Sequence, residues 1–406
     1  MKIIDVLIVG AGAAGMMCAI EAGRRGRSVR VVDHASKPGE KIRISGGGRC
    51  NFTNLEGDRV ERFLGENPRF ATSALKRYGP QDFIKRVDRA GIAWHEKTLG
   101  QLFCDDSAKQ IIRMLTDDMR EAGVTLSLGL SVDGVERSGD GFEARLSDGS
   151  VVWATSLVLA TGGKSIPKMG ATGWAWETAR TFGLRVTETR PGLVPLTFEP
   201  GLLEKLAPLS GLSVEAVISH RASSSAERGR PNEETAFAEG MLFTHRGLSG
   251  PSILQISSYW REGEAITARM APGEDVYAKL KAAKEENGKQ MVHTALSHIV
   301  PRRLAESVCE REGVKGKLAE VGDKVLRRLD EAVNGWTVKP VGSEGYRTAE
   351  VTLGGVATAE LDQQTMAAKA VPGLYVIGEA VDITGWLGGY NFQWAWSSGW
   401  AAGQHC

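Results

Sequence analysis

Residues 1–33 read MKIIDVLIVGAGAAGMMCAIEAGRRGRSVRVVD and contain the pattern that decides the fold. The run Ile3–Val9 is short, apolar and rich in β-branched residues, as in a buried parallel strand. The sequence GAGAAG at Gly10–Gly15 fits G-x-G-x-x-G, helix formers follow, and a second apolar strand, Ser28–Val32, ends at Asp33. The glycine pattern alone is weak evidence. Strand, glycines, helix, strand and terminal acid together predict a βαβ dinucleotide-binding unit.

The glycines of this unit have separate roles toward a dinucleotide. Gly10 permits the tight turn after the strand, and Gly12 lets the backbone approach a pyrophosphate. Gly15 lets the helix pack close to the sheet. The start of the helix, at Ala13 and Ala14, presents free N–H groups and partial positive charge to the phosphates.

The acid at the end of the second strand discriminates between dinucleotides. Asp33 can accept hydrogen bonds from ribose hydroxyls, and its charge disfavours a 2′-phosphate, so NADP is not expected in this site. We expect the next residue, His34, to lie at the cofactor as well. A glycine-rich turn in an ordinary α/β protein is the alternative, and the surrounding pattern argues against it.

Composition leaves room for two or three domains with a sizeable core. The chain has 406 residues, 42% of them hydrophobic, and its 50 Lys and Arg balance 49 Asp and Glu. This balance gives no electrostatic reason to expect nucleic acid or acidic lipid as a partner. Because no run of about 18 apolar residues occurs, no membrane span is expected either. We expect a small-molecule substrate, and no oligomeric state is predicted.

The cysteines and histidines indicate a reducing compartment and no metal. The 5 cysteines are scattered and include no C-x-x-C pair, which argues against disulfides and thiol–disulfide chemistry. The apolar N-terminus looks like a signal peptide, but glycines interrupt it and the strand and loop explain it. His293 and His298 are spaced wrongly for one metal-binding helix face. We therefore expect a cytoplasmic protein without a metal site.

A second glycine-rich stretch, Lys37–Asn54, reads KPGEKIRISGGGRCNFTN. The glycines Gly46–Gly48 stand between a short strand-like piece and a polar cluster, and their N–H groups can come close to a ligand. Lys41, Arg43 and Arg49 add positive charge near the expected pyrophosphate. A basic surface loop is the alternative, but three consecutive glycines are costly unless something must approach closely.

Three stretches together resemble one family of bacterial flavoproteins. They are Gly10–Gly15, the SGGGRCNFTN sequence of residues 45–54 and the GWLGGYN sequence of residues 385–391. Members of that family are described as aminoacetone-oxidase-family or bile-acid-reductase-like (BaiN-type) NAD(P)/FAD-dependent oxidoreductases. The resemblance extends over nearly the whole chain. It implies FAD, a Rossmann-like α/β domain of the two-dinucleotide type and an inserted domain, and it implies a substrate only weakly.

The same resemblance brings further segments to the FAD. The ATGG sequence at Ala160–Gly163 returns the chain past the cofactor, and Val132 lies near the adenine. Asp382 bonds the ribityl hydroxyls, with Glu379 nearby. The helix that starts at Gly388–Asn391 points its N-terminus at the N1/C2=O edge of the flavin. Reduction puts negative charge on that edge, and a helix N-terminus stabilises it.

The expected cofactor site therefore draws on both ends of the chain. No side chain stands out as an acid or a base, so no catalytic residue is predicted, and Cys50 is expected to pack or to contact the cofactor through its backbone. The expected cofactor-binding residues are Gly10, Gly12, Ala13, Ala14, Gly15, Asp33, His34, Lys41, Ser45, Gly46, Gly47, Gly48, Arg49, Cys50, Asn51, Val132, Ala160, Thr161, Gly162, Gly163, Gly378, Glu379, Asp382, Gly388, Gly389, Tyr390 and Asn391.

Periodicity and composition predict the remaining elements. Residues 67–123 are expected to be largely helical, and residues 221–234 to form a polar hairpin or loop. His245 and Arg246 are expected to have a structural or surface role, and the alternative is that they face the flavin across the domain interface. Short β elements are expected at Val124–Leu130, Val132–Arg137, Gly141–Leu146, Val151–Trp153 and Ser156–Ala160.

The chain is expected to form an FAD-binding domain interrupted by an insert. Residues 1–190 form its first part and residues 341–406 its C-terminal part. The insert, 191–340, is expected to contain a β-barrel-like part at about 191–272 and a helical part at about 273–335.

These features predict an FAD-dependent oxidoreductase that transfers hydride between the flavin and a small organic substrate bound between domain and insert. No second G-x-G-x-x-G occurs, so a dedicated NAD(P)H domain is not expected. Either the substrate reduces the flavin and oxygen reoxidises it, or NAD(P)H docks transiently as the reductant. The alternatives are a flavin-containing RNA-modifying or nucleic-acid-associated protein and a non-catalytic FAD-binding protein.

Overall fold

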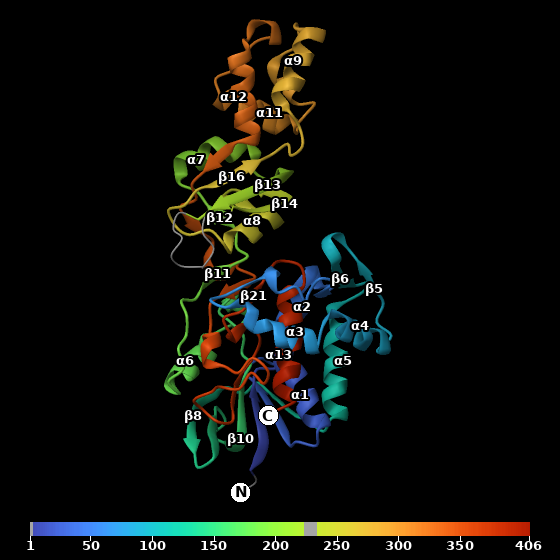
Figure 1. The fold of residues 1–406 in the computed structure, drawn as a ribbon, viewed down its shortest axis with the longest axis vertical. Coiled ribbons are helices and arrows are strands. Elements are labelled where there is room, and N and C mark those ends of the chain that lie inside the picture. The colour runs from blue at the N-terminus through green and yellow to red at the C-terminus, as the bar shows by residue number, and fades with distance from the viewer. Residues whose placement is uncertain (1–2, 223–233) are drawn as a thin grey trace. The chain divides into compact units, whose positions relative to one another are not determined.

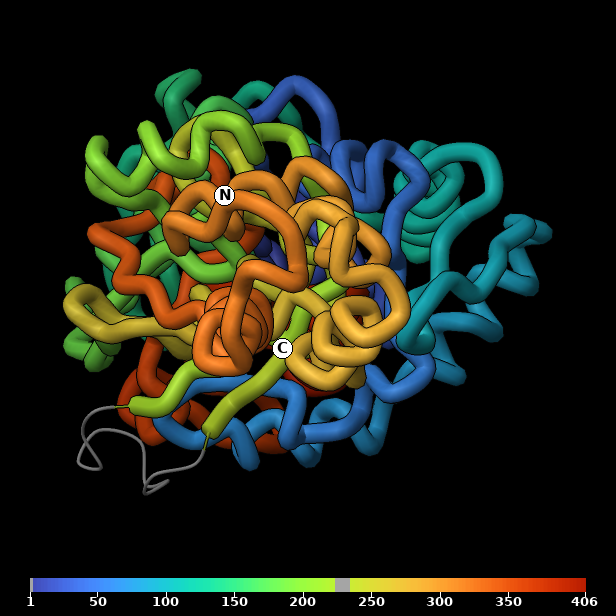
Figure 2. Tube along the Cα trace, turned by 90° about the horizontal axis from the view of Figure 1, so that it is seen from above, coloured from blue at the N-terminus to red at the C-terminus, as the bar shows by residue number. Residues whose placement is uncertain are grey.

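The computed structural model describes residues 3–222 and 234–406, and the contacts within the chain divide it into two compact units. Unit 1 consists of Met1–Arg190 and Glu350–Cys406, and unit 2 of Pro191–Ala349. Figures 1 and 2 trace the chain in two views, coloured along the sequence. Most of the expected polar loop at 221–234 lies outside the described residues. Within the described ranges, no helix is long and apolar enough to cross a membrane.

The centre of unit 1 is a parallel sheet that starts with the predicted βαβ unit. Its strands lie in the order β7-β2-β1-β10, and β20 pairs with the other edge of β10. The register places Val6 opposite Val29 and Ile8 opposite Val158, so these apolar runs are buried together. The strands are β1 (Ile4–Val9), β2 (Val29–Asp33), β7 (Thr125–Leu128), β10 (Val151–Leu159) and β20 (Leu374–Val376). The predicted Rossmann-type α/β fold is confirmed.

Strand β10 carries two pairings along one edge. Residues 151–154 pair antiparallel with β9 (Gly141–Leu146), which pairs in turn with β8 (Val132–Ser138). Residues 157–159 pair parallel with β20. The two separate β elements expected at Val151–Trp153 and Ser156–Ala160 are therefore one continuous strand. Its first half pairs with β9 and its second half with β20.

Helices from the two ends of the chain pack together on this sheet. Helix α1 (Ala13–Arg24) follows β1, and α13 (Tyr390–Gly403) ends the chain beside it (Figure 1). A Cβ at Gly399 would lie 2.4 Å from the carbonyl oxygen of Ala14, so only glycine allows this approach. Two tryptophans of α13, Trp394 and Trp396, are buried, and Trp396 stacks on Phe83 with 4.2 Å between ring centroids.

Residues 40–121 differ from the predicted, largely helical pattern. The piece before the triple glycine is a helix, α2, and not a strand, and three short antiparallel strands form a sheet in the order β3-β6-β5. The elements are α2 (Glu40–Gly48), β3 (Asn51–Asn54), α3 (Thr72–Arg77), α4 (Pro80–Arg89), β5 (Trp94–Glu96), β6 (Gln101–Cys104) and α5 (Ala108–Glu121). The prediction is wrong at residues 94–104 because strands of three or four residues are too short to show a period.

Smaller elements complete unit 1. Strand β4 pairs antiparallel with β21, close to the start of α13. Strand β11 (Arg190–Gly192) spans the boundary to unit 2. The remaining elements are β4 (Phe63–Leu64), α6 (Trp174–Thr181), β19 (Val351–Leu353) and β21 (Thr384–Gly385).

Unit 2 contains one seven-stranded sheet and a group of helices. The strand order is β17-β16-β13-β14-β15-β12-β18, and every pairing is antiparallel. The strands are β12 (Leu196–Thr197), β13 (Ser213–Arg221), β14 (Glu234–Phe243), β15 (Gly247–Ser249), β16 (Ile266–Arg269), β17 (Trp336–Val338) and β18 (Gly342–Ser343). The two edge strands, β17 and β18, therefore follow the helical part in the sequence. They lie outside the range 191–272, in which the β-barrel-like part was expected.

The helices of unit 2 are α7 (Pro200–Leu206), α8 (Pro251–Ser257), α9 (Val276–Asn287), α10 (Val292–Leu296), α11 (Arg302–Arg311) and α12 (Asp323–Asn334). The helices α9 to α12 lie within the predicted helical stretch 273–335, whereas α7 and α8 lie within residues 191–272. His245 and Arg246 lie exposed between β14 and β15, where the hydroxyl of Thr244 accepts hydrogen bonds from the N–H groups of Arg246 and Gly247.

Candidate cofactor-binding site

The glycines after β1 occupy three different environments. At Gly10, φ is +113°, and a Cβ would lie 2.4 Å from the carbonyl oxygen of Ala160. At Gly15, a Cβ would lie 1.9 Å from the carbonyl oxygen of Gly10. At Gly12, by contrast, a Cβ would meet no atom of the described chain within 4 Å, and φ is an ordinary −82°. Gly10 and Gly15 thus serve the fold, whereas Gly12 borders open space.

Helix α1 begins at this open space. Gly12 is its N-cap, and among the described residues no side chain caps the helix and no acid lies in its first turn. The first N–H groups of a helix lack intrahelical partners and carry partial positive charge. The start of α1, with Ala13 and Ala14, is therefore suited to a phosphate group.

Asp33 joins the end of β2 to the glycine turn. Its Oδ2 accepts a hydrogen bond from the N–H of Ala11 at 2.7 Å, and its Oδ1 accepts one from Ala35 at 2.8 Å. Each oxygen of an ionised carboxylate can accept more than one hydrogen bond, so ribose hydroxyls can still bind here. The neighbouring His34 is about half exposed, and its ring lies against Gly170, where a Cβ would be 2.2 Å from Nε2.

We expect Asp33→Ala to weaken FAD binding about tenfold to a hundredfold, because a charge-assisted hydrogen bond to the ribose is lost. The measurement is a fluorescence titration of the apoprotein with FAD. Asp5→Ala is the matched control, since Asp5 also binds backbone N–H and hydroxyl groups, those of Ser28, but at the opposite end of β1. Equal FAD affinity in Asp33→Ala and the wild type would contradict this placement.

The triple glycine forms a left-handed turn at the end of α2. Gly46 and Gly47 have φ of +57° and +66°, and a Cβ at Gly47 would meet no atom within 4 Å in the described chain. Ser45 ends the regular helix, and its carbonyl oxygen accepts a hydrogen bond from the N–H of Cys50 at 3.0 Å. Arg49 is exposed beside Gly48. This turn therefore offers backbone N–H groups and a cation on its open side.

The thiols near this turn are buried. Cys50 and Cys104 are both fully buried, and desolvation raises the pKa of Cys50 well above its usual value and that of Cys104 to about 12. Both side chains are therefore neutral thiols at physiological pH. This environment fits the packing role expected for Cys50.

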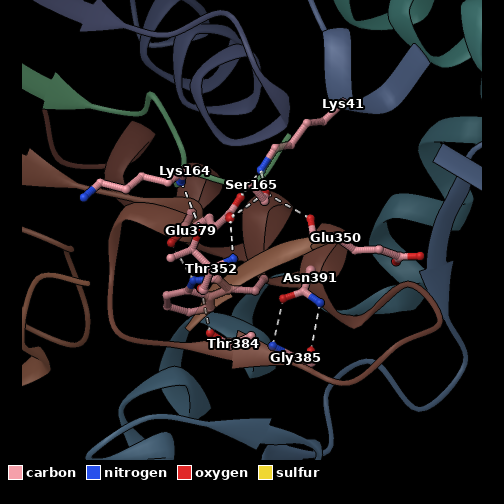
Figure 3. Close-up of polar contacts among 11 residues, drawn as sticks. Lys41, Lys164, Ser165, Glu350, Thr352, Glu379, Thr384, Gly385 and Asn391 are labelled. Atoms are coloured by element: carbon pink, nitrogen blue, oxygen red, sulfur yellow. Dashed lines mark hydrogen bonds and ion pairs between the residues drawn. The ribbon is translucent and has the colours of Figure 1, made fainter. Parts of the chain in front are cut away.

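A polar cluster gathers around Glu379, directly after β20 (Figure 3). Its Oε2 lies 2.6 Å from Nζ of Lys41, and its Oε1 accepts a hydrogen bond from the N–H of Thr352 at 2.8 Å. Lys41 also donates to the hydroxyl of Ser165 at 2.6 Å. A Cβ at Gly163 would lie 2.5 Å from Oε1 of Glu379. Three expected site residues, Lys41, Gly163 and Glu379, therefore meet here.

Two members of this cluster were missed from the sequence. Ser165 follows the ATGG segment by two residues, and Thr352 lies on β19, far away along the chain. The hydroxyl of Thr352 accepts a hydrogen bond from the N–H of Lys164 at 2.9 Å, which fixes the segment after Gly163. The position of Ser165 next to the glycines could have indicated it, whereas no local signal marks Thr352.

Asp382 lies apart from this cluster in its contacts. Its side chain is buried, and its Oδ2 accepts a hydrogen bond from the N–H of Glu66 at 3.0 Å. Desolvation raises the pKa of Asp382 above its usual value. The two acids that sequence reasoning placed together thus have different partners, and Glu379 is the one that contacts Lys41 and Gly163.

The start of α13 is a second uncapped helix N-terminus. Gly388 and Gly389 have φ of +107° and +98°, and within the described ranges no side chain caps the helix. The amide of Asn391 donates to the carbonyl oxygen of Gly385 and accepts from its N–H, both at 2.8 Å (Figure 3). Tyr390 packs edge-on against Phe63. Both side chains hold the preceding loop, so this part of the site offers a ligand backbone N–H groups.

The residues present fit FAD. The hydroxyl of Thr161 is buried and has no hydrogen-bond partner among the described residues, as expected for a group that forms a hydrogen bond with a bound ligand. Gly12 borders open space, and the helices α1 and α13 both start without a cap. Ala160 lies between the end of β10 and Thr161, and Val132 is buried at the start of β8. The site thus combines places for phosphate and for an electron-rich ring edge.

Comparisons with known proteins show the family and several relatives with named activities. A family model described as "HI0933-like protein Rossmann domain" matches residues 4–405. A "Ribosomal RNA dihydrouridine synthase" of Escherichia coli is 49% identical over 100% of this chain and 98% of its own length. A "3-dehydro-bile acid delta(4,6)-reductase" of Clostridium scindens is 27% identical over 98% of this chain and 97% of its own length.

A solved structure shares the fold. The 3-ketosteroid delta1-dehydrogenase of Sterolibacterium denitrificans aligns with a TM-score of 0.50 and 15% identity, covering 100% of this chain and 99% of that one. At this level of identity the likeness shows the architecture alone.

Proposed function

This chain belongs to the HI0933-like Rossmann family of FAD-dependent oxidoreductases, and on that premise we propose that it reduces a uridine of ribosomal RNA to dihydrouridine. The observation that carries the proposal is the E. coli ribosomal RNA dihydrouridine synthase, which is 49% identical along essentially its whole length. A small organic substrate is the second candidate, and the bile-acid reductase at 27% identity favours it.

The two candidate substrates share one chemistry. Dihydrouridine forms when the C5=C6 bond of uracil, conjugated to the C4 carbonyl, gains a hydride and a proton. A 3-oxo bile acid with unsaturation at C4 presents the same arrangement of double bond and carbonyl. We therefore propose the reductase reaction, with NAD(P)H as the transient electron donor, rather than an oxidase reaction.

The residues of the site divide the work of holding the cofactor. Bound FAD supplies the hydride. We propose that the start of α1 binds the pyrophosphate, that Asp33 binds the ribose, and that Glu379 binds the ribityl chain. Glu379 is preferred to Asp382 because it lies beside Lys41 and Gly163. The N-terminus of α13 would stabilise negative charge at the N1/C2=O edge.

The net charge of the chain is weaker evidence about the substrate than its similarity to the E. coli synthase. A net charge of +1 predicts no nucleic-acid partner, but it averages over both units and says nothing of local surfaces. A relative that is 49% identical over essentially the full length of both chains is more specific evidence about the substrate. The RNA is therefore our first candidate substrate, and the small molecule stays as the alternative.

We expect NADH or NADPH to bleach the flavin of the purified protein under anaerobic conditions, and ribosomal RNA lacking dihydrouridine to restore its colour. Mass spectrometry of the RNA then shows a gain of two hydrogen atoms on one uridine. The controls are RNA that already carries dihydrouridine and protein without FAD. Restoration by a steroid enone but not by RNA would favour the small-molecule substrate, and rapid restoration by oxygen alone would favour an oxidase.

A further inference from the structure

At the tip of the β5–β6 hairpin, a leucine has an unfavourable backbone conformation. Leu99 has φ of +58° and ψ of +34°, the left-handed region that suits glycine, and its side chain is 64% exposed. Five non-glycine residues of the described ranges have positive φ, and three of them, Cys50, Leu193 and Met366, are buried. Packing explains those three. Leu99 gains little from burial, so its residue type calls for another explanation.

A buried asparagine fixes this tip to the start of α13. Asn54 is 1% exposed, and its Nδ2 donates to the carbonyl oxygens of Leu99 at 3.0 Å and Gly388 at 2.9 Å. On the opposite side, the N–H of Leu55 donates to the carbonyl oxygen of Gly100 at 2.9 Å. The hairpin tip therefore has a set position relative to the glycines that precede α13, where we place the flavin edge.

The tip combines apolar side chains with a positive charge. Leu55 is 39% exposed, and its link to Gly100 joins it to the same tip. Lys97, two residues before Leu99, is exposed, and its Nζ lies 5.5 Å from the centre of the Phe103 ring. An apolar surface next to a cation is complementary to a nucleotide, which has an apolar base face and a negative phosphate.

We propose that Leu99 is a specificity-determining residue that packs against a base of the RNA substrate next to the target uridine, with Lys97 facing the phosphate. The inference rests on the proposed function. A uridine within folded RNA must leave its stack before its double bond can reach a cofactor. An apolar side chain that takes over the exposed base face lowers the cost of that step, as stacking partners do in other RNA-binding proteins.

The test replaces Leu99 by glycine and by methionine. Leu99→Gly removes the side chain and relieves the left-handed backbone, so the variant folds, binds FAD and melts at the wild-type temperature or above. We expect its kcat/KM on ribosomal RNA to fall about tenfold, the effect of losing one base contact. Leu99→Met restores most of the rate. Ile3→Gly is the control, because Ile3 is equally exposed, at 65%, and precedes β1.

The outcomes separate this inference from the function on which it rests. A wild-type protein without activity on ribosomal RNA would overturn the proposed function itself. An active wild type together with a Leu99→Gly variant of equal kcat/KM would overturn only the role of Leu99. A merely structural role predicts that kcat/KM on RNA falls only together with a lower melting temperature or a lower FAD content.

Discussion

Gly12→Val is expected to fold normally and to lose FAD. The backbone at Gly12 has φ of −82°, which any residue adopts, and a Cβ there would meet no atom of the described chain within 4 Å. The valine therefore causes no clash in the free protein. Its methyl groups would instead occupy the space in which a pyrophosphate must approach the start of α1. We expect the dissociation constant for FAD to rise at least about a hundredfold, equivalent to about 2.7 kcal/mol.

The measurement combines the flavin content of the purified variant, FAD titration of the apoprotein and circular dichroism. Gly15→Val is the contrasting variant, since a Cβ at that position would lie 1.9 Å from the carbonyl oxygen of Gly10. We expect Gly15→Val to lose its fold together with its flavin. If Gly12→Val kept one flavin per chain, the pyrophosphate would have to lie elsewhere.

The features that could be predicted from the sequence are those encoded locally. Glycine spacing, apolar runs and the terminal Asp33 all lie within 33 residues, and the strands β1 and β2 begin and end within about one residue of their predicted limits. The resemblance added the FAD, which no local pattern specifies against other dinucleotides. The strand segments expected at Val151–Trp153 and Ser156–Ala160 were found, but their union in β10 depends on partners elsewhere in the sequence.

The secondary-structure predictions that are wrong also have physical causes. Ile42 and Ile44 alternate like strand residues, yet residues 40–44 are helical and the change of direction comes from the left-handed glycines after them. The β5–β6 hairpin has strands too short for a period, and its turn places a leucine where glycine would be expected.

The polar cluster around Glu379 could not be predicted for another reason. Lys41 and Glu379 are 338 residues apart, and the hydrogen bond between them exists only because the fold brings α2 to the residues that follow β20. Asp382 and Glu379 look equivalent in sequence, as acids three residues apart after a strand. Their surroundings distinguish them. The buried side chain of Asp382 accepts a hydrogen bond from the N–H of Glu66, whereas the side chain of Glu379 is paired with the ammonium group of Lys41.

Glu379→Ala is expected to destabilise the apoprotein by about 2 kcal/mol, because it leaves an ammonium group without its counter-ion and a backbone N–H without its acceptor. The groups concerned are Nζ of Lys41, at 2.6 Å from the carboxylate, and the N–H of Thr352, at 2.8 Å. The loss is smaller than for a fully buried pair, since the Lys41 side chain is 34% exposed and water can reach it. Urea unfolding followed by circular dichroism measures the effect.

Two further variants show whether the position of Glu379 is responsible. Glu66→Ala removes an acid that pairs with Arg185 at the surface, where both side chains are about half exposed. We expect that change to cost at most about 1 kcal/mol. Adding Lys41→Met to Glu379→Ala should recover part of the stability, because the unpaired ammonium is gone. A Glu379→Ala variant no less stable than Glu66→Ala would mean that water already satisfies Lys41 and Thr352, and the cluster would then contribute nothing to the stability of the fold.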